Sequence, residues 1–213
     1  MPPSQEQKHL LETRQSRYDQ YRQKLRPYLT ARGLGEAAAN RFRLGYVEPS
    51  DADQRRYWHR MAIPYLTPTG VVQIRYRCIS GHNHNAENCP KYLGDTGAEV
   101  TLYNAHAVLE SPRVLFITEG EMDAVAISTL AGHAAVGVPG AQAWGKHRYW
   151  ARCFVGFERL IFAADGDDAG EQLARAITKD LPEVHVVRLP DGEDANSVLA
   201  GGVDDFLERC GLA

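Results

Sequence analysis

The sequence has no long hydrophobic run and only four cysteines. Within its 213 residues no apolar stretch approaches the ~20 residues of a membrane-spanning helix, and the first residues contain no apolar segment of a signal peptide. We therefore expect a cytoplasmic protein with no membrane partner. The cysteines are too scattered for a disulfide framework in such a protein, so we interpret them as free thiols or metal ligands. They are Cys78, Cys89, Cys153 and Cys210.

The net charge of −3 conceals an asymmetry between the two parts of the chain. Residues 1–77 contain 14 Lys and Arg against 7 Asp and Glu, a balance of +7, whereas residues 78–213 contain 10 against 20, a balance of −10. A basic region next to an acidic, metal-binding region suits a polyanionic substrate. The alternative is that the basic residues form a solvated helix face and nothing more.

The first part of the chain has helical spacing and then changes to strand-like alternation. Apolar residues at spacings of three, four and seven predict a helix over residues 5–26, followed by short helices at 27–33 and 35–40. Residues 48–56 read as a loop. Residues 61–66 and 71–77, joined by a turn, predict an antiparallel hairpin with Arg75 and Arg77 on one face of its second strand.

The loop that follows this hairpin contains two cysteines and two histidines. Four such ligands are sufficient for a tetrahedral zinc site. Their separations, with three, one and four intervening residues, differ from the usual two well-separated pairs, so we expect a polar surface loop and no zinc. The four residues are Cys78, His82, His84 and Cys89.

Beyond residue 110 short apolar runs alternate with helical segments. Strands are expected near 114–118, 134–138, 159–163 and 184–189, with helices near 121–131, 143–152, 168–180 and 203–210. This alternation predicts an α/β domain with a mostly parallel four-stranded sheet flanked by helices. We place it at residues 111–213, after an α+β, basic subdomain at residues 1–110.

Two of these strands end abruptly in carboxylates and glycine. Glu119 follows the first strand, and Asp165 and Asp167 follow the third, at the carboxyl edge where open α/β sheets bind ligands. A third acidic segment, residues 189–196, lies near the end of the chain. Helix capping accounts for one of these acids but not for all of them. Converging carboxylates with hard oxygen ligands favour Mg²⁺ or Mn²⁺.

These motifs resemble a known family. Residues 119–123 (Glu-Gly-Glu-Met-Asp) and 165–167 (Asp-Gly-Asp) resemble the two motifs of a Toprim domain. Residues 28–34 and 42–46 are similar to the entry of the catalytic core of bacterial and phage DnaG-type primases, and residues 63–65, 70–77, 91–93 and 102–103 to its basic subdomain. Residues 189–194 are similar to the segment that follows its Toprim sheet. The resemblance covers about residues 24–200.

The resemblance implies roles for individual residues. Glu119 matches the family's catalytic glutamate, and Asp165 and Asp167 join it in catalysis. Glu119, Asp123, Asp165, Asp167 and Asp194 match the acids of its metal site. In the basic subdomain Arg75, Arg77 and Lys91 are our candidates for template or nucleotide contacts, of which Arg77 and Lys91 match basic residues of the family. Asn196 stands where the bacterial family usually has aspartate, which removes one negative charge.

The function implied is that of a DNA primase, a nucleotidyltransferase that synthesises short RNA primers on single-stranded DNA from ribonucleoside triphosphates with Mg²⁺ or Mn²⁺. Separate zinc-ribbon and replicative-helicase partners are expected, because the chain shows neither domain, and a phage-encoded protein would act in the host cytoplasm. Two alternatives remain open: a Toprim nuclease, and an inactive module that binds single-stranded DNA.

Overall fold

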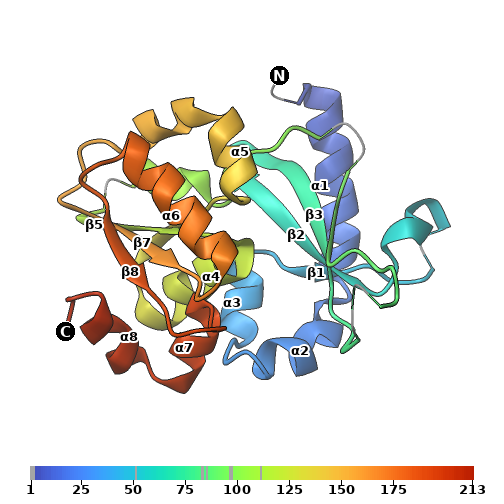
Figure 1. The fold of residues 1–213 in the computed structure, drawn as a ribbon. Coiled ribbons are helices and arrows are strands. Elements are labelled where there is room, and N and C mark those ends of the chain that lie inside the picture. Colours follow the sequence, from blue (N-terminus) through green and yellow to red (C-terminus); the bar gives the residue numbers. More distant parts are fainter. Residues whose placement is uncertain (1–2, 51, 83, 85, 96–97, 111) are drawn as a thin grey trace. The chain divides into compact units, whose positions relative to one another are not determined.

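The computed structural model describes residues 3–50, 52–82, 84, 86–95, 98–110 and 112–213, which form two compact units, Met1–Glu99 and Val100–Ala213 (Figure 1). The division lies before residue 100, whereas the expected boundary followed residue 110. The reason is a β-bridge between Tyr103 and Gly137, which attaches the intervening segment to the second unit. No helix in the described part of the chain has the length and apolar character needed to cross a membrane.

The first unit is built from short helices around a four-stranded antiparallel sheet of order β1-β2-β3-β4. Strands β2 and β3 are the predicted hairpin. The elements are α1 (Gln5–Asp19), η1 (Arg22–Leu25), α2 (Arg26–Thr30), α3 (Glu36–Arg41), β1 (Gly45–Tyr46), η2 (Ala52–Tyr57), β2 (Arg60–Thr67), β3 (Gly70–Cys78) and β4 (Tyr92–Gly94).

Helix α1 ends earlier than its apolar spacing predicted. It begins with a capping box at Ser4 and stops at Asp19, after which the chain tightens into the 3-10 helix η1. Arg22 explains the change of direction, because its guanidinium donates both to the Leu44 carbonyl (2.8 Å) and to the Asp19 carboxylate (2.7 Å). The apolar residues at the predicted spacings are still largely buried, but they belong to two different kinds of helix.

The core of the first unit is aromatic and lies between α1 and the sheet. Tyr76 of β3 stacks on Tyr57, with ring centroids 3.8 Å apart, and meets Tyr18 of α1 edge-on at 6.1 Å. Gly45 allows β1 to approach α1, since a Cβ at this position would lie 2.6 Å from the Cβ of Tyr18. This packing holds β3, and with it the predicted basic residues, in a fixed position.

The second unit is a parallel sheet of order β6-β5-β7-β8, as the βα alternation predicted. Its elements are η3 (Ala105–Val108), β5 (Val114–Thr118), α4 (Glu121–Ala126), η4 (Ile127–Ala131), β6 (Ala134–Gly137), α5 (Ala141–Lys146), η5 (Arg148–Phe154), β7 (Arg159–Ala164), α6 (Asp168–Asp180), β8 (His185–Arg188), α7 (Ala195–Gly201) and α8 (Val203–Arg209).

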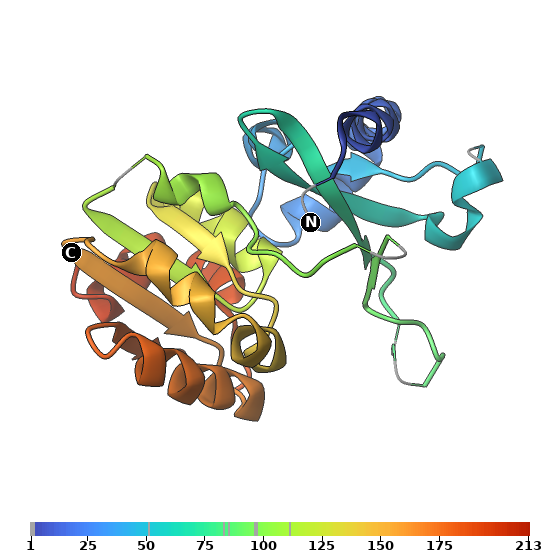
Figure 2. The same ribbon diagram turned by 90° about the horizontal axis from the view of Figure 1, so that it is seen from above.

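Helices cover both faces of this sheet (Figure 2). On one face Leu115, Ile117 and Phe162 pack with Trp144 of α5 and Leu173 of α6. Alternate residues along the strands face the other side of the sheet. There Phe116 packs against Phe206 of α8, with ring centroids 5.8 Å apart. Because both faces are covered, the ends of the strands are where polar side chains can gather.

Candidate active site

The acidic residues of the second unit lie at the carboxyl ends of two neighbouring strands. Strands β5 and β7 are paired in parallel, with Ile117 beside Phe162. Glu119 directly follows β5, and Asp165 directly follows β7. The two carboxylates predicted from separate stretches of sequence therefore start from adjacent strands at one edge of the sheet.

The other predicted acids are positioned by the first turns of three helices. Asp123 lies in α4, is buried, and accepts a hydrogen bond of 3.0 Å from the Asn196 backbone N–H. Asp167 caps α6 by accepting from the Gly170 N–H at 2.8 Å. Asp194 caps α7 by accepting from the Ser197 N–H at 2.7 Å. Each of these contacts fixes the carboxylate group through one of its oxygens.

Burial and mutual repulsion shift the pKa values of the two carboxyls at the strand ends. Burial, followed by the negative charges of Asp123, Glu119, Asp194 and Asp167, raises the pKa of Asp165 to about 9. Burial and the charges of Asp167 and Asp123 raise the pKa of Glu119 to about 7, while a backbone hydrogen bond with Asp165 acts in the opposite direction. All five predicted acids thus contribute to one electrostatic cluster.

Two oxygens of this cluster are buried without a hydrogen-bond donor among the described residues. They are Oε1 of Glu119 and Oδ1 of Asp165. An unsatisfied buried carboxylate oxygen is costly, and a bound cation satisfies it while neutralising the cluster. The donor set consists of hard oxygens, which fits Mg²⁺ or Mn²⁺.

Two glycines allow the acidic loops to approach each other, and sequence reasoning assigned them no role. A Cβ on Gly170 would lie 2.1 Å from the Asp165 carbonyl oxygen and 2.7 Å from Oε1 of Glu119. A Cβ on Gly166 would lie 1.9 Å from the Pro190 carbonyl oxygen. The signal was present in the sequence, because glycine directly beside acidic residues often marks close backbone approach.

Helix α7 is the other feature that the sequence did not reveal. It begins immediately after Asp194, so the acidic segment at 189–196 is a helix N-terminus as well as a source of charge. The loop before it is joined to the β7–α6 loop by two backbone hydrogen bonds: Gly166 N–H donates to the Glu193 carbonyl at 2.9 Å, and Gly192 N–H donates to the Gly166 carbonyl at 2.7 Å. The sequence signal was the capping pattern of Asp194 with Ser197.

Two of the three predicted basic residues of the first unit, Arg75 and Arg77, lie against the ring of Tyr92. Strand β4 pairs with β3 so that Tyr92 is opposite Arg77. The guanidinium of Arg75 lies 4.7 Å from the ring centroid and that of Arg77 lies 5.1 Å from it. Arg77 is only 6% exposed, whereas Lys91 is exposed and Arg75 is half-buried. Arg75 and Lys91 are thus more accessible to a phosphate than Arg77.

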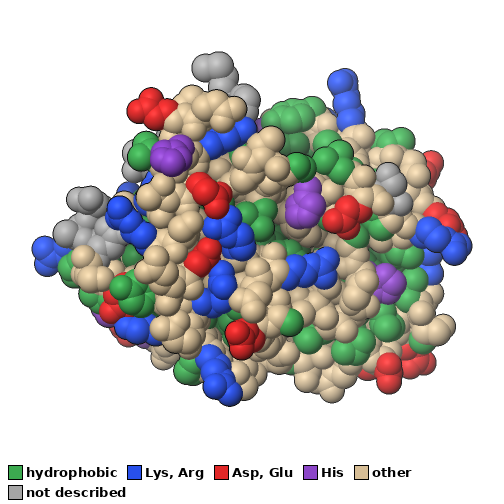
Figure 3. All heavy atoms as spheres, turned by 180° about the vertical axis from the view of Figure 1, so that it is seen from behind, with side chains coloured by type: hydrophobic (Ala, Val, Ile, Leu, Met, Phe, Trp, Pro, Cys, Tyr) green, Lys and Arg blue, Asp and Glu red, His purple; other side chains and the backbone are tan. Residues whose placement is uncertain are grey.

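Several other basic side chains of this unit are held in ion pairs. Arg14 of α1 pairs with Asp95 at 3.0 Å, and Arg43 pairs with both Glu12 at 2.6 Å and Asp19 at 3.0 Å. Figure 3 shows basic and acidic side chains interspersed on the face that it draws. Arg14 and Arg43 are therefore less available to a phosphate than an unpaired cation would be.

Comparison with known proteins places both the acidic unit and nearly the whole chain among related folds. Residues 116–199 match a family model described as Toprim-like. The Gene 57 protein of Mycobacterium phage D29 is 37% identical over 155 residues, which are 70% of this chain and 96% of the phage protein. The chain belongs to the family of this phage protein.

More distant relatives extend the similarity to the first unit. The DNA primase of Pasteurella multocida is 28% identical over 211 residues, covering 81% of this chain and 36% of the primase. A solved structure of the DnaG primase catalytic domain bound to ssDNA matches with a TM-score of 0.74 at 22% identity, covering 95% of this chain and 79% of that one. This family member therefore has a DnaG-type primase core with a Toprim domain, which confirms the predicted resemblance and fold class. It corresponds to about a third of the length of the bacterial primase.

Proposed function

We propose that this protein is the catalytic core of a DNA primase, which synthesises short RNA primers on a single-stranded DNA template. The observation that carries the proposal is the cluster of five carboxylates at the edge of the parallel sheet, in which Glu119 and Asp165 have buried oxygens that no donor of the described residues reaches. The same chain also has the basic antiparallel unit, which a stand-alone Toprim nuclease does not need. The similarity to DNA primases along most of the chain supports this reading.

The proposed metal ligands are the acids that share the cluster. The charge on Asp165 interacts with those of Asp123, Glu119, Asp194 and Asp167, and that on Glu119 interacts with those of Asp167 and Asp123. Bound Mg²⁺ or Mn²⁺ supplies charge neutralisation at the triphosphate and lowers the pKa of the attacking 3′-hydroxyl. The residues would hold the ion through their carboxylate oxygens, and the ion would take the place of the protons that the cluster otherwise binds.

Glu119 is the proposed proton acceptor. In the metal-free protein its pKa is about 7, raised by burial and by the charges of Asp167 and Asp123, so this carboxyl can hold or release a proton near neutral pH; a bound cation would favour its charged, proton-accepting form. A general base works best when its pKa lies near the working pH. In the proposed reaction Glu119 takes the proton of the 3′-hydroxyl as the oxygen attacks the α-phosphate of the next nucleotide, and pyrophosphate leaves.

The first unit is the proposed binding surface for the template and the nucleotide. Arg75 and Lys91 offer charge to phosphate groups, and Tyr92 places an aromatic ring between Arg75 and Arg77. The related DnaG catalytic domain that was solved with ssDNA supports single-stranded DNA as the template. We further propose ribonucleoside triphosphates as substrates, separate zinc-ribbon and replicative-helicase partners, and the cytoplasm of a bacterial host as the site of action.

A primer-synthesis assay tests this function. The chain is incubated with single-stranded DNA, labelled ribonucleotides and Mg²⁺ or Mn²⁺, with and without a zinc-ribbon protein. We expect short labelled RNA from the parent and from the control Glu183→Gln, which changes an exposed glutamate, and none from Glu119→Gln. Primer synthesis by Glu119→Gln at the parent's rate would overturn the assignment.

Parallel reactions with end-labelled DNA, together with a binding titration on the same DNA, separate the alternatives. Cleavage of end-labelled DNA by the parent without RNA synthesis would identify a nuclease. Binding of DNA, with neither RNA synthesis nor cleavage under any of these metal conditions, would identify a binding module. Because each function gives a different combination of these three readouts, they distinguish the functions directly.

A further inference from the structure

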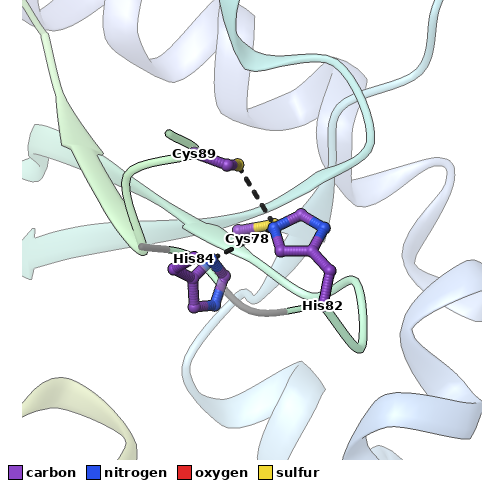
Figure 4. Close-up of side chains that lie close together, drawn as sticks. All are labelled: Cys78, His82, His84 and Cys89. Carbon is purple, nitrogen blue, oxygen red and sulfur yellow. Dashed lines mark hydrogen bonds between the residues drawn. The ribbon is translucent and has the colours of Figure 1, made fainter. Parts of the chain in front are cut away.

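The loop between β3 and β4 brings together the two cysteines and two histidines that the sequence places at irregular intervals. Cys78 ends β3, and the chain returns through His82, His84 and Cys89 before β4 begins (Figure 4). One ligand atom from each of these four residues lies within 4.8 Å of the others. Cys78 is buried and the other three are half-buried.

Three of the six distances between these atoms match those around a tetrahedral zinc ion. Zinc–sulfur bonds of about 2.3 Å and zinc–nitrogen bonds of about 2.0–2.1 Å require ligand separations of about 3.8 Å between sulfurs, about 3.6 Å between sulfur and nitrogen, and about 3.3 Å between nitrogens. The corresponding separations are 3.9 Å from Cys89 Sγ to Cys78 Sγ, 3.7 Å from Cys78 Sγ to His82 Nε2, and 3.2 Å from His82 Nε2 to His84 Nδ1.

A disulfide does not explain the same geometry. A disulfide would place the two sulfurs about 2.05 Å apart, and both cysteines are free thiols at nearly twice that separation. Direct hydrogen bonds between the four side chains would account for the contacts one pair at a time. They give no reason for two thiols and two imidazoles to converge on one point, since thiols are weak donors and weak acceptors.

Two neighbours suit the residues to a metal-bound state. Glu87 has a carboxylate oxygen 3.5 Å from Nδ1 of His82, the ring nitrogen opposite the one that faces the cluster. A carboxylate in this position commonly orients a metal-binding histidine. Arg60 donates to Cys89 Sγ at 3.2 Å and to the Pro90 carbonyl at 2.8 Å. The contact with Cys89 places a positive charge beside the sulfur that would carry negative charge in a zinc-bound state.

We propose that Cys78, His82, His84 and Cys89 bind one Zn²⁺ in a structural site. Four protein ligands fill a tetrahedron and leave no open position for catalysis. Two thiolates balance the charge of the ion. This reverses the sequence-based expectation of a polar loop without zinc, which rested on spacing alone and contained no information about how the loop closes.

The site would hold β4 against β3. Cys78 N–H already donates to the Lys91 carbonyl at 2.9 Å, and the Cys89 N–H closes the loop by donating to the His84 carbonyl at 3.0 Å. Strand β4 is only three residues long, so these contacts alone provide little resistance to fraying. A bound ion would fix the ends of both strands and with them Lys91, which is two residues beyond Cys89.

Metal analysis of the full chain, purified without chelator, is the first test. We expect about one zinc per chain in the parent. The control Cys153→Ser, which changes an exposed cysteine elsewhere, should retain it, whereas Cys89→Ser and His84→Asn should lose most of it. Zinc that stays in both loop variants but leaves Asp165→Asn would show that the ion binds the acidic cluster, and it would overturn the proposal.

Cobalt substitution identifies the ligands even if a variant folds poorly. After removal of zinc by a chelator under reducing conditions, the parent titrated with Co²⁺ should develop intense visible bands of a tetrahedral site and a near-ultraviolet thiolate charge-transfer band. In Cys89→Ser the charge-transfer band should fall by about half, because one of two thiolates is removed. A parent that contains no zinc and shows neither band with Co²⁺ would overturn the proposal. Neither readout depends on primer synthesis, so this site and the proposed activity can fail separately.

Discussion

Asp165 should make the stability of the metal-free protein depend on pH. Burial and the neighbouring carboxylates raise its pKa to about 9 in the folded protein, whereas aspartate in an unfolded chain titrates near about 3.9. The folded state therefore keeps this proton through neutral pH, and the unfolded state does not. The associated stability is fully present below about pH 4 and is lost as pH rises toward about 9.

The size of the effect follows from proton linkage. One extra proton on the folded state changes the free energy of unfolding by about 1.4 kcal/mol per pH unit, so pH 6 to 8 gives at most about 2.7 kcal/mol. Asp165 is half-buried, and solvent screening should reduce this to about 1–1.5 kcal/mol. Glu119, whose pKa is raised to about 7 chiefly by burial, acts in the same direction over the lower part of this interval.

Urea unfolding in the presence of EDTA at pH 6, 7 and 8 measures this directly, with tryptophan fluorescence and circular dichroism as independent probes. Asp165→Asn keeps the shape of the side chain but cannot titrate, so it should lose most of the pH dependence and exceed the parent in stability at pH 8. The control Asp204→Asn changes an exposed acid of α8 and should keep the parent's slope. Adding Mg²⁺ should flatten the parent's slope, because the ion replaces protons in the cluster.

Either of two results would refute this reasoning. The first is a parent protein whose stability in EDTA stays constant or increases from pH 6 to 8. The second is an Asp165→Asn variant with the same slope as the parent, which would assign the pH dependence to other groups. The parent and Asp165→Asn differ in one ionisable group, so the difference between their slopes reports Asp165 together with its effect on the carboxyls around it.

Gly170→Ala should destabilise the second unit by about 1–3 kcal/mol, because its Cβ would meet the Asp165 carbonyl oxygen at 2.1 Å. The control Gly145→Ala, with open space around it, should be neutral or stabilising by up to about 1 kcal/mol. Urea titration compares the two variants, and equal stabilities would contradict the clash. Arg75→Ala and Lys91→Ala should each lower the salt dependence of single-stranded DNA binding by up to about 0.7 log units per log unit of salt. Anisotropy titrations at several salt concentrations measure this slope, and an unchanged slope would exclude a phosphate contact. Arg77→Ala should instead lower the thermal stability of the first unit by about 1–3 kcal/mol, since this buried side chain packs on Tyr92; an unchanged melting curve would argue against a packing role.

The sequence predicted the second unit better than the first. The strands of the parallel sheet are short runs, mostly apolar, that end at glycine or a charged residue. Such strands can be recognised in the sequence because both faces of the sheet are covered. The predicted strand at 114–118 is β5 without a change of bounds. Helix 5–26 was wrong beyond Asp19, because the turn there depends on Arg22 reaching Leu44, a contact between residues far apart in the chain.

Some residues of the candidate sites could be predicted from the sequence, and others could not. The strand-end acids were predictable because parallel strands place their carboxyl ends together, which needs only the order of the elements. The close approach at Gly170 was not, because it depends on how α6 packs against the β5 and β7 loops. Loop closure between Cys78 and Cys89 also escaped prediction. Residue spacing measures distance along the chain, whereas zinc binding depends on distance through space.

The two proposed metal sites differ in a way that lets one chain keep two ions apart. The cluster around Asp165 offers only carboxylate oxygens. Such ligands suit a hard ion that retains some of its water ligands and also binds substrate phosphates. The loop from Cys78 to Cys89 offers two sulfurs and two nitrogens that close around a softer ion. Because zinc binds oxygen ligands more strongly than magnesium does, excess zinc would also compete for the carboxylates. The loop site should therefore be loaded with one equivalent of zinc before Mg²⁺ dependence is measured, and inhibition should appear only when zinc exceeds that equivalent.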